Sequence, residues 1–525
     1  MLKSFLIACF VPLLISSNCV AEKPLYTTSF EDITSGQFDT AVINGLRFTT
    51  SGTCNITNNY SRTGKQCLHL LGDEGNVITL DLPATMQDVK GISFHAERWT
   101  SRDPFAFSVD VNVNGKWKGI AKLDQVTVVG ARFLSHIQLA IKEESKISAI
   151  RFRVAAASKA GLLIDDLSLL NSPPDRPTAI PSESFPTKPL KLASSQTLFK
   201  SGTNDTHTYR IPAVITAKNG DIVAACDARR KNSADLGKQR TIDIVFRRST
   251  DNGITWSAME VMDPITDGGC SDPSLVLDRE TGELFCFYNY MSSDKSINEY
   301  RFILQKSIDH GKTWGKPIDF TEQVAGPELK NSFKFITSGR GIQTSDGTLL
   351  HNYVQVGKGV TVIASTDHGK SWSAVVDVPH GDESKLVELA DGSLMINSRI
   401  APGRRNVHRS QDGGKTWSTE ADFSLCDPRC NASIIRYPAG LHGNESELLL
   451  FCNAASNSGR KNLSVRFSKD NGDTWSAGSV IDSGPSAYSE LDILADGKLI
   501  VVYEPGHSEI RAATFELGEL LSPKK

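Results

Sequence analysis

Five copies of one short motif constrain the fold of this chain more than any other feature. They read STDNGITWS from residue 249, SIDHGKTWG from 307, STDHGKSWS from 365, SQDGGKTWS from 410 and SKDNGDTWS from 468. Successive copies are 58, 58, 45 and 58 residues apart, and strand-like sequence fills the intervals. A repeat with a period in this range indicates a radial or stacked array of similar units.

The repeats predict a six-bladed β-propeller over residues 195–525. About 54 residues are available to each of six blades between residues 195 and 521, which is enough for four short strands and their turns. The pattern around each copy alternates apolar and polar residues, as strands do. The fold class predicted for the whole chain is therefore all-β.

The motif itself has a structural explanation. Its Ser and Asp side chains can bind the backbone amides of a turn, its Gly permits positive φ, and its Trp can fold under the turn as an anchor. These sequences are Asp boxes, and we assign them no catalytic role. Their five aspartates are thus set aside as candidates: Asp251, Asp309, Asp367, Asp412 and Asp470.

A second all-β domain is expected before the propeller, over residues 22–172. Short alternating segments with Gly, Asn and Asp turns predict a jelly-roll-like β-sandwich. Trp99 and Trp117 lie in it, and either they are core residues or they form part of a carbohydrate-binding module. Residues 173–194 are rich in proline and predict a stiff, extended linker.

The first 21 residues predict export. Lys3 precedes an apolar stretch that is too short to span a membrane, and small and polar residues follow it, as in a secretory signal peptide. Lipidation at Cys19 is the less favoured alternative. We expect a periplasmic, extracellular or cell-surface protein without a membrane span.

Export would permit disulfides. Two local pairs are plausible, Cys54 with Cys67 and Cys426 with Cys430, and buried thiols are an equally good interpretation of each. No cysteine or histidine cluster has zinc spacing. The net charge of −3 gives no general attraction to nucleic acid or to an anionic membrane, so an anion would require a local site.

A different set of polar residues lies at predicted strand ends, scattered among the blades. It is found in the segments TYRIPA, DARRKNSADLG, ESKLVELADGSLMINSR, SGRKNLSVRFSKD, AYSEL and VVYEPG, and comprises Arg210, Arg229, Asp235, Glu383, Arg399, Arg460, Tyr488 and Glu504. Any one of these residues alone could be structural. Their order along the chain makes a joint functional role the better interpretation.

With these motifs in this order, residues 195–525 resemble the bacterial sialidases of glycoside hydrolase family 33. The resemblance implies that Arg210, Arg399 and Arg460 bind the substrate carboxylate. It further implies that Asp235 is the acid/base and that Tyr488 is the nucleophile, with Glu383 as its partner. Glu504 would brace Arg210, Arg229 would line the pocket, and Asp272 and Gln343 are further candidates for it. One departure is Glu490 in AYSEL, where many relatives carry Asp.

The chemistry of sialic acid agrees with these roles. Its anomeric carbon carries a carboxylate, which guanidinium groups can bind edge-on while staying charged at any relevant pH. A carboxylate nucleophile would be repelled by that group, whereas a neutral phenol is not, and sialidases are a known tyrosine-nucleophile exception among glycosidases. We therefore expect a retaining exo-α-sialidase acting on sialylated glycans.

Two alternatives use the same residues. A trans-sialidase or intramolecular trans-sialidase would give a different product, and a non-catalytic propeller would only bind sialoglycans. The second would need the arginines but not Asp235, Glu383 and Tyr488. The proposed chemistry requires no metal or organic cofactor, and we expect a monomer that does not bind nucleic acid.

Overall fold

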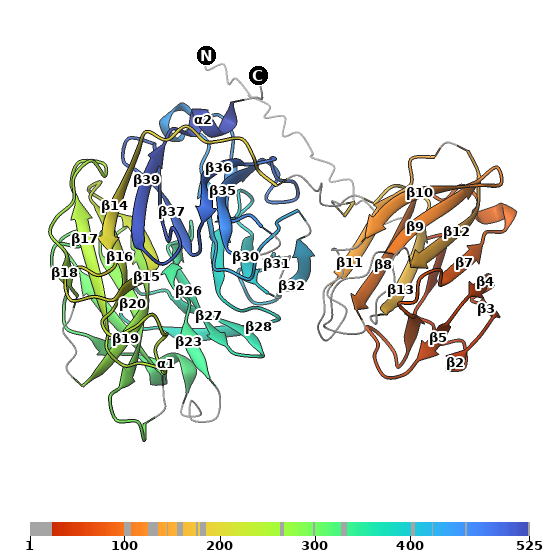
Figure 1. The fold of residues 1–525 in the computed structure, drawn as a ribbon, viewed down its shortest axis with the longest axis horizontal. Helices are drawn as coiled ribbons and strands as arrows, with labels where there is room; N and C mark the ends of the chain where they lie inside the picture. The colour runs from red at the N-terminus through yellow and green to blue at the C-terminus, as the bar shows by residue number, and fades with distance from the viewer. Residues whose placement is uncertain are drawn as a thin grey trace, which may run out of the picture.

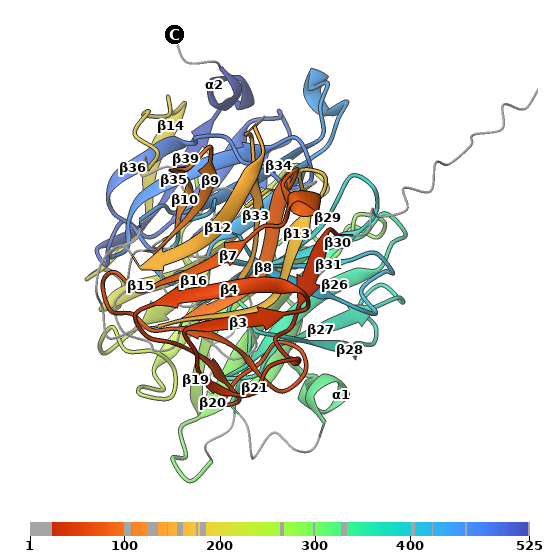
Figure 2. The ribbon, with the colours of Figure 1, turned by 90° about the vertical axis from the view of Figure 1, so that its right-hand side faces the viewer.

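The computed structural model describes residues 24–522, except for residues 99–106, 124–134, 144, 155–160, 175–176, 179–184, 263–266, 298–299, 327–332, 401–404, 423 and 457–458. The predicted signal peptide, Cys19 and Trp99 lie outside the described residues. The described residues form two β-rich bodies, which appear separately in Figure 1 and one in front of the other in Figure 2. Among these residues, every helix is too short or too polar to cross a membrane.

The N-terminal body is a sandwich of two sheets. The first contains, in spatial order, β11 (Ser135–Ala140), β8 (Gly91–Arg98), β13 (Leu162–Leu170), β6 (Cys67–Leu70), β5 (Cys54–Thr57) and β2 (Gly36–Gln37), with β1 (Tyr26–Thr28) also on β13. The second contains β10 (Lys116–Leu123), β9 (Phe107–Val113), β12 (Ile147–Val154), β7 (Val77–Asp81), β4 (Leu46–Ser51) and β3 (Thr40–Ile43). A short 3-10 helix, η1 (Ala84–Met86), follows β7.

The period-two pattern of the sandwich strands accounts for its core. In β12, Ile150 and Phe152 are fully buried between the sheets, whereas Arg151 between them faces outward. Trp117 is 36% exposed, and the guanidinium carbon of Arg151 lies 4.2 Å from its ring centroid. Trp117 is therefore a surface residue, as a sugar-stacking role would need.

The C-terminal body has six sheets, as expected for the propeller. The first sheet has β15 (Thr208–Thr216), β16 (Ile222–Arg229), β17 (Ile242–Ser249) and β18 (Glu260–Val261), and the second has β19 (Gly268–Leu277), β20 (Leu284–Ser292), β21 (Arg301–Ser307) and β22 (Ile318–Asp319), with β24 (Gly339–Arg340) on β19. The third has β26 (Leu349–Gln355), β27 (Gly359–Ser365) and β28 (Ser373–Pro379), with β23 (Lys334–Ile336) and β25 (Ile342–Gln343) on β26, and the fourth has β29 (Ser384–Glu388), β30 (Leu394–Arg399), β31 (Arg405–Ser410) and β32 (Ser418–Asp422). The fifth has β33 (Ser433–Tyr437), β34 (Leu448–Ala454), β35 (Lys461–Ser468) and β36 (Ser479–Pro485), and the sixth has β37 (Ser489–Ile493), β38 (Leu499–Tyr503), β39 (Glu509–Phe515) and β14 (Ser194–Lys200). Short helices α1 (Thr321–Ala325), η3 (Leu441–Gly443) and α2 (Leu517–Leu521) connect or follow them.

The ring is closed by the two ends of the domain. β14, which comes directly after the linker, pairs antiparallel with β39 near the C-terminus, so one blade combines both ends of the sequence. The linker is also attached to this body, because Leu190 N and Val480 N donate to the carbonyls of Val480 and Lys188 at 2.7 Å each.

Each Asp box begins at the last residue of the penultimate strand of its blade. In the first box, Ser249 Oγ donates to Asp251 Oδ1 at 2.8 Å and accepts from Gly253 N at 2.9 Å. Thr255 donates its amide and hydroxyl to the two oxygens of Asp251 at 2.8 and 2.6 Å. The same bonds recur in the other boxes, with Ser371 in place of the threonine in the third. The aspartates thus hold turns, as the sequence predicted.

No disulfide forms among the eight cysteines that the structure describes, so the thiol interpretation of both candidate pairs holds. The register of β5 and β6 explains why Cys54 and Cys67 do not form a disulfide. Cys54 lies opposite Leu70, while Cys67 lies opposite Thr57, at the other end of the short ladder. A disulfide would need their Cα atoms to be within about 7 Å.

Candidate active site

The candidate residues meet at one end of the propeller. Within a blade, adjacent strands are antiparallel, so the start of the innermost strand and the end of the second strand lie at the same end. Arg210 is near the start of β15, and Glu383 and Tyr488 directly precede β29 and β37. Arg229 and Arg399 end the second strands β16 and β30, and Glu504 directly follows β38. The Asp boxes end strands that run parallel to the innermost ones, so they lie at the opposite end.

Tyr488, Glu383 and Arg399 form the centre of this group. The Tyr488 hydroxyl lies 2.7 Å from both carboxylate oxygens of Glu383, to which it donates. Arg399 Nη1 is 2.9 Å from that hydroxyl and also donates to Glu383 Oε2. Burial and the Glu383 charge raise the pKa of Tyr488 well above its ordinary value, although Arg399 and Arg460 act in the opposite direction. The phenol is therefore neutral and its proton already points at a carboxylate.

Arg210 is held by Glu504, as the resemblance implied. Arg210 Nε donates to Glu504 Oε1 at 2.8 Å, and the amide of Ile211 donates to the same oxygen at 2.7 Å. The ladder between β15 and β16 is interrupted from Arg210 to Ala213, and Ile211 has φ 61°. This is a costly conformation for a β-branched residue, and the carboxylate of fully buried Glu504 helps to maintain it.

Arg460 completes the group of three arginines around Tyr488. The guanidinium carbons of Arg460 and Arg210 lie 5.3 and 5.6 Å from the Tyr488 ring centroid. Arg460 Nη2 donates to the carbonyl of Arg429 at 3.0 Å. The three guanidinium groups, from different blades, thus surround one phenol.

Arg229 connects Asp235 to a buried carboxylate that sequence analysis missed. Its Nη1 donates to Asp235 Oδ1 and to Ser233 O at 2.7 Å each, and its Nη2 to Asp227 Oδ2 at 3.1 Å. The Asp235 side chain is 74% exposed, so it can reach an incoming ligand. Asp227 stands two residues before Arg229 and hence on the same face of β16, and this spacing was the signal that could have identified it.

Asp272 is placed beside the group by a second bulge of the same kind. Like Ile211, it has positive φ (61°) and precedes a proline, and its amide donates to Asp227 Oδ1 at 2.9 Å. Ser271 and Asn289 donate to its carboxylate at 2.8 and 3.1 Å. Burial raises the pKa of Asp272 to about 6, and the negative charge of Glu383 raises it too.

This shift predicts a pH dependence of stability. Because the folded-state pKa lies above the ordinary 3.8, the folded protein binds more protons than the unfolded chain between these values. The Asp272 contribution to the free energy of unfolding therefore falls as pH rises from about 4 to 6. We expect Asp272→Asn to gain on the order of 1–3 kcal/mol relative to wild type between pH 4 and pH 7. Urea unfolding at both pH values tests this, and an unchanged difference would contradict it.

The structure does not bring Gln343 to this group. Gln343 ends β25, at the opposite end of the propeller, where Nε2 donates to Asp278 Oδ1 at 2.9 Å and Oε1 accepts from Arg279 N at 2.8 Å. The prediction that it lines the substrate pocket is therefore wrong. The direction of its strand, which the sequence does not show, decides this.

Glu490, the residue that departs from the usual family motif, lies in the centre of the propeller beneath the candidate residues around Tyr488. Its Oε2 is 3.5 Å from Lys385 Nζ, and its Oε1 accepts from Ser433 Oγ at 2.7 Å. A Cβ at Gly339 would lie 2.0 Å from Oε2, so the longer side chain needs this glycine. Glu490 is thus paired in the core and leaves Tyr488 in place.

Among the described residues, no cluster of three or more metal-ligating side chains is found.

Comparisons with known proteins agree with the fold and with the resemblance seen in the motifs. The sialidase of Micromonospora viridifaciens is 35% identical over 360 residues, which cover 63% of this chain and 54% of that protein. The sialidase of Bacteroides fragilis is 31% identical over 356 residues, or 61% of this chain and 63% of that protein. The chain thus matches less than two thirds of the length of these curated relatives.

A solved structure extends the likeness to most of the chain. The Hadza microbial sialidase Hz136 has a TM-score of 0.57 at 24% identity, over 86% of this chain and 98% of that one, which shows a shared fold. The BNR repeat-like domain matches residues 220–501, more than half of the chain and most of the propeller. The chain therefore belongs to the BNR repeat-like domain family.

Proposed function

We propose that this protein is a retaining exo-α-sialidase that releases terminal sialic acid from sialylated glycoconjugates through a tyrosyl-sialyl intermediate. The observation that carries the proposal is the Tyr488 hydroxyl, 2.7 Å from both oxygens of Glu383 and surrounded by Arg210, Arg399 and Arg460. A site that only binds an anion needs the arginines but not a tyrosine hydrogen-bonded to a base. The sialidases among its relatives support the same substrate class.

In the first step the three arginines hold the substrate carboxylate beside Tyr488. The phenolic oxygen forms a bond to the anomeric carbon while its proton passes to Glu383. The glycosidic C–O bond breaks, and protonated Asp235 gives its proton to the leaving oxygen. The arginines hold and neutralise the substrate carboxylate, while the phenolic oxygen of Tyr488 and the carboxylate of Glu383 oppose the positive charge that develops in the oxocarbenium-like transition state.

In the second step Asp235, now a carboxylate, removes a proton from water. The resulting hydroxide oxygen attacks the anomeric carbon, the bond to Tyr488 breaks, and Glu383 returns the proton to the phenolate. Two inversions give net retention.

Two measurements test the proposal together. A fluorinated sialosyl fluoride, whose tyrosyl adduct hydrolyses slowly, should add to Tyr488 and to no other residue, as read from peptide masses. Proton NMR of sialyllactose hydrolysis should show the α-anomer of sialic acid first, and spectra with added lactose would reveal any transfer product. The β-anomer as first product, or a label on a different residue, would overturn the mechanism.

Tyr300 is a predicted positioning residue for Asp235. Its hydroxyl donates to the carbonyl of Leu236 at 2.5 Å and would lie 3.3 Å from a Cβ at Gly237, so it holds the loop that follows Asp235. Tyr300→Phe should lower turnover of sialyllactose about 10-fold, because misplacing a general acid removes part of its usual 10²–10⁴-fold effect.

The leaving group separates this role from a merely structural one. A 4-methylumbelliferyl sialoside needs little protonation when its phenol departs, so Tyr300→Phe should slow it less than about 3-fold. Tyr290→Phe is the matched control, since the Tyr290 hydroxyl bonds the Asp267 carbonyl at 3.3 Å instead. Equal losses on both substrates would refute the positioning role.

A further inference from the structure

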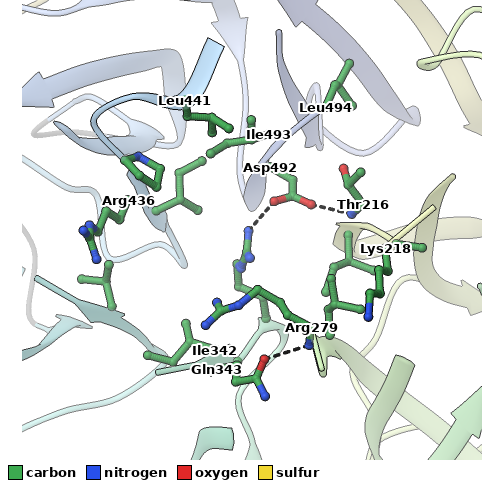
Figure 3. A pocket seen from close by; sticks show the side chains of 18 of the residues that line it. Thr216, Lys218, Arg279, Ile342, Gln343, Arg436, Leu441, Asp492, Ile493 and Leu494 are labelled. Atoms are coloured by element: carbon green, nitrogen blue, oxygen red, sulfur yellow. Dashed lines mark hydrogen bonds and ion pairs between the residues drawn. The ribbon is translucent and has the colours of Figure 1, made fainter. Parts of the chain in front are cut away.

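The far end of the propeller contains a cavity that the proposed reaction does not use. It has a volume of about 450 Å³ and lies where the innermost strands end, beside Thr216 of β15, Glu388 of β29 and Asp492 of β37 (Figure 3). We call it the far cavity. The catalytic candidates lie at the other ends of these same strands, so the two sites are separated by the core of the propeller.

The walls of the far cavity are predominantly apolar. They come from all six blades and from η3, and the lining side chains include Ile215, Leu277, Ile342, Leu386, Ile435 and Ile493. Ligand pockets of roughly 300–1,000 Å³ with apolar walls and a few polar groups are typical small-molecule sites. A polyhydroxylated sugar would leave many hydroxyls without partners against these walls, so they suit a hydrocarbon or aromatic body.

The polar groups of the far cavity are mainly cationic. Lys218, Arg279, Arg340 and Arg436 line it, against the carboxylates of Glu388 and Asp492. Arg436 is occupied, because it forms a bidentate pair with Glu447 at 2.8 and 3.1 Å. The remaining cations therefore decide what the cavity can bind.

Arg340 has spare donor capacity inside the far cavity. Its Nη1 donates to Asp492 Oδ1 at 2.8 Å and to Leu491 O at 3.1 Å, whereas Nη2 has no partner among the residues that the structure describes. The Asp492 carboxylate is also used by the amide of Thr216, at 2.5 Å. This ion pair is thus fixed in the protein and leaves one edge of the guanidinium available.

Arg279 and Lys218 lie at the mouth of the far cavity. In the described part of the chain neither has a carboxylate within ion-pair distance: Arg279 Nη2 donates to Thr344 O at 3.0 Å, and Lys218 Nζ to Glu280 O at 2.9 Å. Figure 3 shows the Arg279 side chain reaching across the cavity. A guanidinium with free donors beside apolar walls is suited to a carboxylate on an apolar body.

We propose that the far cavity binds a small amphipathic carboxylate, of the size of a medium-chain fatty acid. The carboxylate lies between Arg279 and the free edge of Arg340, and the apolar body contacts the isoleucine and leucine walls. The site is distinct from the candidate active site and does not depend on its chemistry.

Octanoate is the probe that tests the proposal, by calorimetric titration of the full chain. It should bind, whereas acetate, which lacks the apolar body, and octan-1-ol, which lacks the charge, should each bind at least 10-fold more weakly. Arg279→Gln should weaken octanoate binding at least 10-fold and leave sialoside turnover unchanged. Lys370→Gln, in the Asp box at the same end of the propeller, removes one positive charge outside the cavity and should change neither.

The candidate active site is the main competing site, because its arginines also attract carboxylates. Arg399→Ala should therefore leave octanoate binding unchanged. A second cavity variant, Ile493→Asp, should abolish it by placing a carboxylate on the wall. The proposal is overturned if wild type does not bind octanoate, if octan-1-ol binds equally well, or if Arg399→Ala and not Arg279→Gln removes binding.

Discussion

Tyr488→Phe is expected to lower kcat for sialoside hydrolysis at least about 10³-fold, which corresponds to roughly 4 kcal/mol of lost transition-state stabilisation. The change removes one oxygen, the atom that would attack the anomeric carbon, and leaves a ring of nearly the same shape. The three arginines stay in place, so substrate binding should change far less than turnover. A fluorogenic sialoside gives kcat and KM separately, and a fall confined to kcat is the expected pattern.

A matched control separates this effect from the loss of a buried hydroxyl. Tyr437 is also buried and its hydroxyl donates to Gly497 O at 3.1 Å, near the far end of the propeller. Tyr437→Phe should cost about 1 kcal/mol of stability and leave kcat close to wild type. Tyr488→Phe turnover within 10-fold of wild type would contradict the nucleophile assignment.

Glu383→Gln should act on the same step. The amide cannot accept the phenol proton, so the double variant Tyr488→Phe/Glu383→Gln should be hardly slower than Tyr488→Phe alone. Residues that act as one unit are strongly non-additive.

The sequence predicted the features that rest on local chemistry. The Asp boxes could be interpreted as turns because each motif contains its own donors, acceptors and glycine. Arg210, Glu383 and Tyr488 could be grouped because each lies at a strand end of a repeating unit. The pairing of Arg210 with Glu504, 294 residues apart, followed only from the resemblance, and the structure shows it at 2.8 Å.

The features that the sequence did not reveal depend on the directions and registers of strands and on which buried side chains contact one another. Gln343 resembled a pocket residue, but the direction of β25 places it at the far end of the propeller. Asp227 was not singled out in the sequence, yet its carboxylate accepts from Arg229 and from the amide of Asp272. The spacing of Cys54 and Cys67 allowed a disulfide and buried thiols equally, and only the register of β5 and β6 shows that the two residues lie at opposite ends of the ladder.

Arg210→Lys is the second change with a large expected effect. Lysine keeps the positive charge, but its ammonium cannot bond Glu504 through one nitrogen while presenting two others edge-on to a carboxylate. Loss of one charge-assisted hydrogen bond costs about 1.5–3 kcal/mol, so kcat/KM should fall roughly 10- to 150-fold. Urea unfolding should show little change, because Glu504 keeps a cationic partner and its bond from Ile211 N.

Glu504→Gln distinguishes the two roles that Arg210 could have. If Glu504 acts on turnover by orienting Arg210, then Glu504→Gln should reduce kcat/KM in the wild-type background and add little in the Arg210→Lys background. If Arg210 is only structural, its ion pair with Glu504 matters for folding alone: Arg210→Lys would then be within 2-fold of wild type in kcat/KM, and both variants would unfold at lower urea concentration. The interrupted ladder at Ile211 favours the first outcome, since a strained backbone stabilised by a buried carboxylate is a costly way to place a merely structural arginine.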